Sequence, residues 1–260
     1  MRLLGSVSLL LTLAACNPGS EAPPSAADQG ASAPDSQAGD GSRAPSRTID
    51  ALSEDTLPVV VFFGTSLTSG MGLQSEDDTY VAHLTELAAD AGVPFTAVNA
   101  GVSGETSAGG VRRIDWVLQE PLDILVLELG ANDGLRGLPV AELRDNLLTI
   151  IRRTKERYPA AKIVVLGMEA PPNLGRRYVT SFREVFRDVA TREDTYFVPF
   201  FLDGVAGVRE LNAADGIHPT ETGHRRMAEN ILPELTAALE AASHGTDGEP
   251  VAAEGGDGNR

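Results

Sequence analysis

Apolar runs alternate with amphipathic stretches along the middle of this chain. The runs are rich in Val, Ile, Leu and Phe, which is typical of strands buried on both faces of a parallel sheet. We expect five such strands, at residues 58–63, 96–99, 124–129, 162–168 and 196–200.

The stretches between these strands place apolar residues three and four positions apart, which is the spacing of a helix with one buried face. They predict helices at residues 79–91, 109–118, 140–158 and 181–192, and a last helix at about residues 221–240. Strands and helices that alternate in this way favour right-handed crossovers and a parallel sheet with helices on both faces. The predicted fold class is therefore α/β, a three-layer α/β/α sandwich with a five-stranded parallel sheet. In such sheets, ligands bind at the carboxyl ends of the strands.

The start of the chain has the pattern of a bacterial export signal. Arg2 precedes a short apolar stretch that ends in small residues and is too short to span a bilayer. A motif that resembles a lipobox follows, Leu13-Ala14-Ala15-Cys16, in which the cysteine is lipidated and becomes the mature N-terminus. Cys16 is the only cysteine, so an intramolecular disulfide is excluded. We expect a signal peptide at residues 1–15 and lipidation of Cys16; a cleaved signal with an incidental cysteine is the open alternative.

Two further segments have almost no aliphatic or aromatic side chains, so they cannot bury enough apolar surface to offset the entropy lost on ordering. We expect a disordered tether at residues 16–52, one domain at residues 53–240 and a disordered acidic tail at residues 241–260. An anchored domain would belong to the bacterial cell envelope, on the periplasmic face. Asn17, rather than an aspartate, follows the cysteine and favours the outer membrane.

The charge of the chain argues against a nucleic acid as a partner. It has 21 Lys and Arg residues and 37 Asp and Glu residues, which gives a formal net charge of −16. Binding to a phosphate backbone needs clustered positive charge. We therefore expect no nucleic-acid partner.

Ser66 is the first candidate for chemistry, because it comes directly after the first predicted strand in Gly64-Thr65-Ser66-Leu67. A serine hydroxyl is a poor nucleophile unless a base takes its proton. Taken alone, a serine in a glycine-rich turn is better explained by turn chemistry or a helix cap. The sequence lacks Gly-x-Ser-x-Gly, which excludes the nucleophile elbow of the α/β-hydrolases.

His218 is the candidate base. Asp215 stands three residues before it, and at that spacing a carboxylate can reach the imidazole, select its tautomer and stabilise the imidazolium. Of the other histidines, His83 and His224 fall in predicted helices and His244 falls in the tail. A metal site built from Asp215, His218 and His224 is the alternative, but no further ligands accompany it. We expect no metal and no cofactor.

These segments, in this order, resemble the sequence blocks of the SGNH (GDSL-type) hydrolases, and within them the bacterial arylesterase, lysophospholipase and acyl-thioesterase group. The resemblance extends over about residues 57–240. It includes the run from Leu129 to Gly137 and the segment Gly175-Arg176-Arg177-Tyr178. It implies the flavodoxin-like fold of that family and a serine esterase that acts through an acyl-enzyme, with Ser66, Asp215 and His218 as its catalytic residues.

The resemblance also implies an oxyanion hole. Its donors would be the backbone N–H groups of Ser66 and Gly101 and the side-chain amide of Asn132, which follows the third predicted strand. Donors of this kind stabilise the negative oxygen that develops on an attacked ester. Thr65 departs from the family pattern, because an aspartate that supports the loop usually stands there. The threonine hydroxyl can bond nearby backbone, so we expect an active enzyme whose nucleophile loop is braced differently.

Apolar residues of the later loops could wall a groove for an acyl chain. The candidates for substrate binding are Met71, Leu135, Pro172 and Tyr178. The expected substrate is a small ester, a lipid ester or a thioester. One alternative is an O-acetyl esterase for carbohydrates or cell walls, although aromatic residues, which stack on sugars, make up only 5% of the chain. A second alternative is a non-catalytic surface lipoprotein that binds lipid or glycan.

Overall fold

The computed structural model describes residues 57–243. The predicted signal peptide, Cys16, the predicted tether and residues 244–260 of the predicted tail lie outside the described residues. Within the described range, no helix has both the length and the apolar character needed to cross a membrane.

The described residues form a sheet of five strands, and every pair of neighbouring strands is parallel. Its order is β2-β1-β3-β4-β5. The central strands carry uninterrupted apolar side chains that are almost completely buried, as a sheet covered on both faces requires. The strands are β1 (Val59–Gly64), β2 (Thr96–Gly101), β3 (Ile124–Leu127), β4 (Lys162–Leu166) and β5 (Tyr196–Val198).

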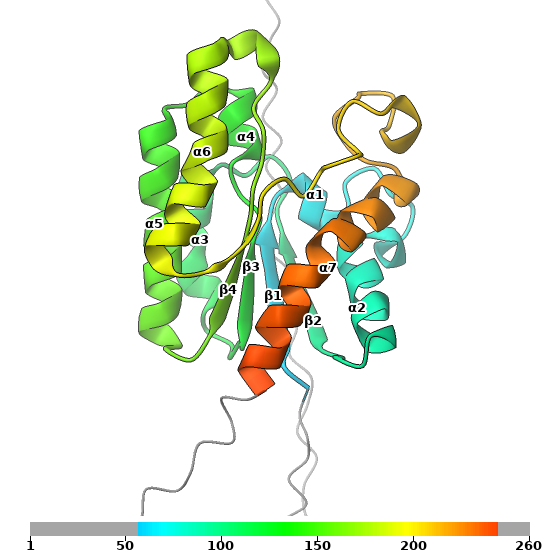
Figure 1. Ribbon diagram of the computed structural model, residues 1–260, viewed down its shortest axis with the longest axis vertical. Helices are drawn as coiled ribbons and strands as arrows, with labels where there is room; N and C mark the ends of the chain where they lie inside the picture. Colours follow the sequence, from blue (N-terminus) through cyan, green and yellow to red (C-terminus); the bar gives the residue numbers. More distant parts are fainter. Residues whose placement is uncertain (1–56, 244–260) are drawn as a thin grey trace, which may run out of the picture. The chain divides into compact units, whose positions relative to one another are not determined.

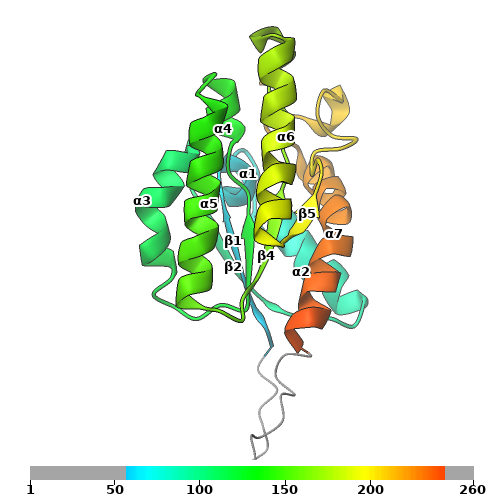
Figure 2. The same ribbon diagram turned by 60° about the vertical axis from the view of Figure 1, so that its left-hand side comes forward.

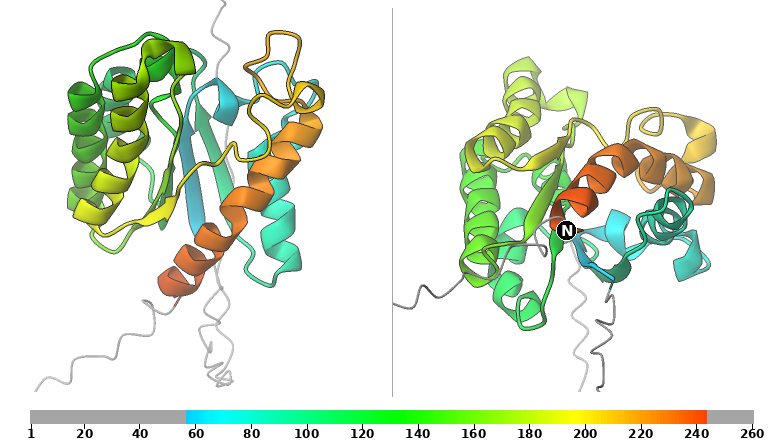
Figure 3. Two further views of the ribbon diagram at one scale, coloured as in Figure 1. Left: turned by 45° about the horizontal axis from the view of Figure 1, so that its top comes forward. Right: turned by 60° about the horizontal axis from the view of Figure 1, so that its bottom comes forward.

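Helices cover both faces of this sheet (Figure 1). Three of them lie side by side on one face (Figure 2), namely α3 (Ser107–Val117), α5 (Val140–Arg157) and α6 (Arg176–Glu193). The other face is covered by α2 (Tyr80–Asp90) and α7 (Glu221–Ser243), which pack against each other. The two helical layers with the sheet between them are visible in Figure 3. The predicted three-layer α/β/α sandwich with a five-stranded parallel sheet is confirmed.

Some elements differ from the prediction in their bounds. Helix α6 begins at Arg176, five residues before the expected start, and α7 ends at Ser243 rather than at residue 240. Two short helices directly after strands were not predicted, α1 (Ser66–Ser69) and α4 (Ala131–Leu135). Each has at most five residues, so neither is long enough to show a helical period in the sequence. Three short 3₁₀ segments complete the described elements, η1 (Glu76–Asp78), η2 (Pro172–Leu174) and η3 (Arg209–Leu211).

The carboxyl ends of the strands lie together at one edge of the sheet, at the top of Figure 1. Helix α1 follows β1 there, α4 follows β3 closely, and the loop before α7 reaches the same edge. This edge therefore brings together the three polar segments that the sequence distributes over more than 150 residues.

Candidate active site

Ser66, His218 and Asp215 form one continuous set of contacts. The hydroxyl oxygen of Ser66 lies 3.0 Å from Nε2 of His218. Nδ1 of His218 lies 2.7 Å from Oδ2 of Asp215. The imidazole can therefore accept the serine proton at one nitrogen while the carboxylate holds its other nitrogen.

We call residues 64–70 the nucleophile loop. Thr65 is the N-cap of α1, and its hydroxyl accepts a hydrogen bond from the N–H of Leu67 rather than from that of Ser66. The N–H of Ser66 therefore keeps no partner inside the helix, as is usual in a first helical turn. Gly70 ends α1 in the left-handed conformation, with φ of 72°. Ser66 itself is only 9% exposed.

We call residues 215–218 the acid–histidine loop. Oδ1 of Asp215 accepts hydrogen bonds from the backbone N–H groups of Ile217 and His218, at 2.9 and 3.1 Å. Gly216 has φ of 70°, a conformation that costs glycine little and lets the chain turn back on the carboxylate. The hydrogen bond to His218, and then these backbone N–H groups, hold the pKa of Asp215 well below its ordinary value. Asp215 therefore stays ionised.

Asn132 lies in the first turn of α4 and faces the same pocket as Ser66. Its side-chain amide donates no hydrogen bond within the described part of the chain. The neighbouring residue holds the helix start in place: the buried carboxylate of Asp133 accepts the N–H and the hydroxyl of Ser107, at 2.8 and 2.6 Å. Asn132 is thus positioned and still has a free donor.

The structure does not support Gly101 as an oxyanion donor. Its N–H donates to Oδ1 of Asn99 at 3.0 Å, and Gly101 does not line the pocket. A Cβ at Gly101 would lie 2.3 Å from the backbone nitrogen of Ser69, so this glycine is explained by the close approach of β2 to α1. Gly104 lines the pocket instead, and its carbonyl is held by Arg136 at 3.0 Å. Gly104 has φ of 78°, and a sequence does not show which of its glycines adopts such a backbone conformation beside the pocket.

The pocket in front of Ser66 and His218 has a volume of about 820 Å³, within the range of small-molecule sites. Three of the residues predicted to bind substrate line it: Met71, Leu135 and Pro172. Most of its other lining side chains are apolar, and they come from α1, α4 and the loops after β4 and β5. These are Leu67, Ala131, Met168, Ala170, Pro171, Phe200, Leu202, Ala206 and Ile217.

Tyr178, the fourth residue predicted to bind substrate, is not part of this pocket. Its hydroxyl donates to the carbonyl of Leu138 at 2.7 Å, and its ring stacks on Phe182. Tyr178 therefore binds α6 to the segment that follows α4, and the prediction that it contacts the substrate is wrong.

The remaining histidines of the described region have packing positions. His224 is buried, its Nδ1 accepts the N–H of Tyr80 at 3.1 Å, and its ring stacks on that of Tyr80. Burial, followed by the charges of His83 and His218, lowers the pKa of His224 to about 4. Within residues 57–243, no three His, Cys, Asp or Glu side chains come together as metal ligands would.

The site can now be compared with known proteins. A model described as the GDSL-like Lipase/Acylhydrolase family matches residues 62–226. The chain belongs to this family. It is 43% identical to esterase TesA of Pseudomonas aeruginosa, over 68% of this chain and 87% of that protein. It is 32% identical to an arylesterase of Vibrio mimicus, over 69% of this chain and 89% of that protein.

Solved structures agree with this assignment. A crystal structure of TesA shares 40% sequence identity and superimposes with a TM-score of 0.66, over 69% of this chain and 99% of that chain. The crystal structure of AlinE4, described as an SGNH-hydrolase family esterase, shares 36% identity with a TM-score of 0.59, over 76% of this chain and 100% of that chain. The protein is thus a carboxylic ester hydrolase with the SGNH-hydrolase fold.

Proposed function

We propose that this esterase cleaves its substrate through an acyl-enzyme formed on Ser66. The 3.0 Å contact between Oγ of Ser66 and Nε2 of His218 carries this proposal. His218 takes the serine proton as Oγ attacks the ester carbonyl, and the imidazolium then protonates the leaving alcohol or thiol. Water, deprotonated by His218, then attacks the acyl-enzyme, which releases the acid and regenerates Ser66. Asp215 keeps the imidazole in the tautomer whose Nε2 can accept the proton.

Three donors face the oxygen that becomes negative during this attack: the N–H of Ser66, the N–H of Gly104 and the side-chain amide of Asn132. The support for this set is that all three residues line the pocket and that, within residues 57–243, the N–H of Ser66 and the amide of Asn132 have no hydrogen-bond partner. Preorganised donors at a developing oxyanion are often the largest catalytic contribution of such a site.

The substrate that fits the pocket is an ester or thioester with an apolar acyl group. Its apolar lining supports this class, as do the names of relatives, among them an arylesterase and a thioesterase 1/protease 1/lysophospholipase L1 from Escherichia coli that is 32% identical over 54% of this chain. Phe200 is the only aromatic residue among the lining residues of this pocket, so sugar stacking, and with it an O-acetyl esterase, is less well supported.

A panel of p-nitrophenyl esters from acetate to palmitate tests the substrate class. We expect kcat/KM to rise from acetate to chains of intermediate length, because each buried methylene adds to binding. A matched acetylated oligosaccharide serves as the competing substrate. Preference for the acetylated sugar over every aliphatic ester would replace our proposal by the O-acetyl esterase.

We also propose that a lipid at Cys16 anchors the enzyme in the bacterial cell envelope, facing the periplasm. The support is the sequence Leu13-Ala14-Ala15-Cys16 after an apolar stretch. Two or more acyl chains hold a protein stably at a membrane, whereas one chain binds only marginally. Intact mass of the mature N-terminus and membrane fractionation test this proposal, with Cys16→Ser as the control. An unmodified N-terminus, or one that begins at another residue, would mean a protein without this anchor.

A further inference from the structure

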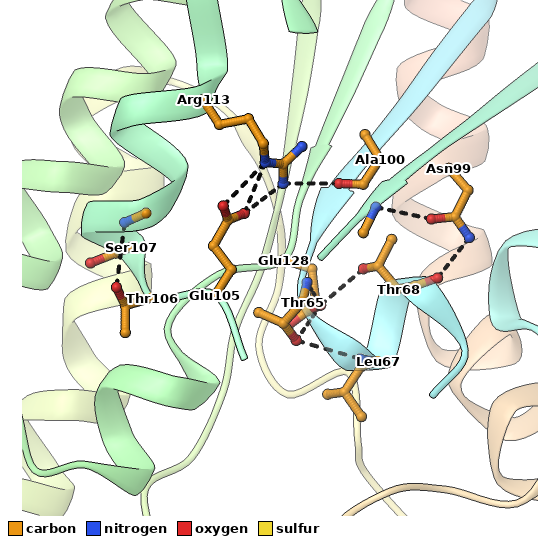
Figure 4. A network of polar contacts seen from close by, with 12 residues as sticks. Thr65, Leu67, Thr68, Asn99, Ala100, Glu105, Thr106, Ser107, Arg113 and Glu128 are labelled. Carbon is orange, nitrogen blue, oxygen red and sulfur yellow. Dashed lines mark hydrogen bonds and ion pairs between the residues drawn. The ribbon is translucent and has the colours of Figure 1, made fainter. Parts of the chain in front are cut away.

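Glu128 is a buried carboxyl group that the proposed mechanism does not use. It follows β3 directly, and its N–H continues the pairing with β1 by donating to the carbonyl of Phe63 at 2.9 Å. The residue is 1% exposed, and within the described chain it forms no ion pair. Its side chain lies against the nucleophile loop (Figure 4).

Several hydrogen bonds from the nucleophile loop converge on this carboxyl group. Oε2 of Glu128 accepts the backbone N–H of Thr65 at 2.7 Å, the hydroxyl of Thr65 at 3.0 Å and the hydroxyl of Thr68 at 2.9 Å. Oε1 lies 3.1 Å from the same Thr65 hydroxyl. The carboxyl group therefore binds the residue before Ser66 and the residue two positions after it.

The directions of these hydrogen bonds favour an ionised Glu128. The Thr65 hydroxyl accepts from the N–H of Leu67, so its own proton is available for Glu128. The Thr68 hydroxyl lies 2.8 Å from that of Tyr80, and if Tyr80 donates, Thr68 can donate to Glu128. A carboxylate accepts all of these protons, whereas a protonated carboxyl must give its own proton to one of the hydroxyls and reverse a bond.

The chain also leaves room for this carboxyl group. A Cβ at Gly64 would lie 2.6 Å from Oε2 of Glu128 and 2.0 Å from the hydroxyl oxygen of Thr68. Any side chain at residue 64 would displace the carboxylate or the helix start that it binds. The glycine at the end of β1 is therefore explained by the close approach of Thr68 and Glu128.

We propose that Glu128, as a carboxylate, is a positioning residue of the esterase reaction, which fixes the backbone on both sides of Ser66 so that its hydroxyl and its N–H face the pocket. This inference rests on the proposed role of Ser66. Glu128 does not line the pocket, and its side-chain hydrogen bonds go to Thr65 and Thr68 rather than to His218, so it acts only through the nucleophile loop. Misplacement of a reacting group by about 1 Å can cost on the order of 10²-fold in rate.

Ionisation of Glu128 should then affect activity in a measurable pH range. Burial raises the pKa of Glu128 to about 7, although the hydrogen bonds from Thr65 and Thr68 oppose this rise. Tyr80 on α2 faces the network, and burial raises the pKa of its hydroxyl well above the ordinary value, so Tyr80 remains a donor.

The other charged groups near this region do not replace Glu128 as the titrating group. His224 on α7, which packs behind Tyr80, is neutral above about pH 5 because burial lowers its pKa to about 4. Arg113 on α3 lies over the ring of Phe63, where it is bound to Glu105 and to the carbonyl of Ala100. Its charge is therefore engaged elsewhere.

Glu128→Gln tests the inference because it keeps the shape and removes the charge. We expect kcat to fall about 10-fold or more with KM within about twofold, since no lining residue of the pocket changes. We also expect the acid limb of log kcat/KM against pH to lose one ionisation, leaving that of the remaining base. A loss of stability alone would change neither the slope of this limb nor the split between kcat and KM.

Glu193→Gln is the matched control. Glu193 is also a largely buried carboxylate, but it pairs with Lys155 and Arg152 at the end of α6 that is remote from the pocket. We expect wild-type kcat and an unchanged acid limb. Ser66→Ala is measured in parallel: if it keeps turnover, the proposed function fails, whereas an inactive Ser66→Ala with an unaffected Glu128→Gln overturns only this inference.

Folding of each variant is checked by circular dichroism. If Glu128→Gln does not fold, Thr68→Val takes its place, because it removes one donor to Glu128 and leaves the carboxyl group. A reduced kcat with KM retained supports the inference. A folded variant with wild-type kcat, or with only KM changed, overturns it.

Discussion

The nucleophile loop and the acid–histidine loop meet at a single hydrogen bond, between Ser66 and His218, but they are held in place by different means. The nucleophile loop is buried, and its main support, Glu128, is 63 residues away from Thr65 in the sequence. The acid–histidine loop is held by bonds between residues two and three positions apart, and the side chain of Asp215 is 48% exposed. One loop depends on the tertiary fold, and the other is largely a local turn.

This difference has consequences for what a substitution does. Removing a group from the buried loop leaves unsatisfied donors where water cannot replace the lost partner. Removing a group from the exposed loop leaves a position that water can fill. Substitutions in the first loop should therefore change stability and activity together, and substitutions in the second should change activity with little change in stability.

The largest expected effect concerns the bond that joins the two loops. Ser66→Ala and His218→Ala should each lower kcat by on the order of 10³-fold or more, because both residues act in one proton-transfer unit. The double variant should be little worse than the poorer single variant. Turnover of p-nitrophenyl butyrate measures this effect, and near-wild-type activity of either variant would contradict the assignment.

Asn132→Ala should have the next largest effect. We expect kcat to fall about 10²–10³-fold, as when a side-chain donor is removed from other oxyanion holes, and KM to change little. The conservative variant Asn132→Asp, which offers no amide, should be similarly impaired. A change confined to KM would instead make Asn132 a residue that binds the substrate in its ground state.

Asp215→Asn tests the exposed loop. The Asn oxygen can still accept the two backbone N–H groups, so its amide would face Nδ1 of His218 and favour the tautomer that cannot accept the serine proton. We expect kcat to fall about 10²-fold, less than the roughly 10⁴-fold cost at a buried triad aspartate, because water reaches Asp215. The free energy of unfolding should change little, because the side chain of Asp215 is half exposed. A large loss of stability would remove the contrast between the two loops.

The smallest expected effect is the pH dependence of stability that Glu128 contributes. Burial raises its pKa from 4.5 to about 7, so the folded state binds this proton more tightly than the unfolded state does. The contribution of Glu128 to stability is therefore largest below about pH 4.5 and is lost as the pH rises through 7. Relative to Glu128→Gln, the wild type should lose about 2–3 kcal/mol of unfolding free energy between pH 5 and pH 8.5. Urea denaturation of both proteins at these two pH values measures it, and parallel curves would contradict the shifted pKa.

The fold was largely predictable because its signals are long and periodic. The five strands and five long helices appeared as apolar runs and as three- and four-residue spacings. Helices α1 and α4 were not predicted because a helix of four or five residues makes little more than one turn and shows no period in the sequence. The early start of α6 was not predicted because Arg176 and Arg177 in its first turn are polar and exposed, so they add nothing to the apolar spacing.

The sequence predicted the three side chains that meet at Ser66, but not the direction of a backbone N–H or of every long side chain. The sequence shows that residue 101 is a glycine, but not that its N–H is taken by Asn99 while Gly104 lines the pocket. The sequence predicts Tyr178 as part of the wall of an acyl groove because it lies among apolar residues of the later loops, whereas its hydroxyl binds a carbonyl of a neighbouring segment. The direction of an N–H or of a long side chain depends on φ, ψ and neighbours, none of which a residue type specifies.

By itself, the sequence determined the order of strands and helices, the Asp215–His218 turn and the place of Ser66 after a strand, because each depends on residues close together in the chain. Only the tertiary structure decided that Ser66 meets His218 across 152 positions and that Glu128 takes the support of the nucleophile loop. Burial is the physical reason: a carboxyl group acquires a raised pKa and a fixed set of donors only when the sheet and its helices have closed around it.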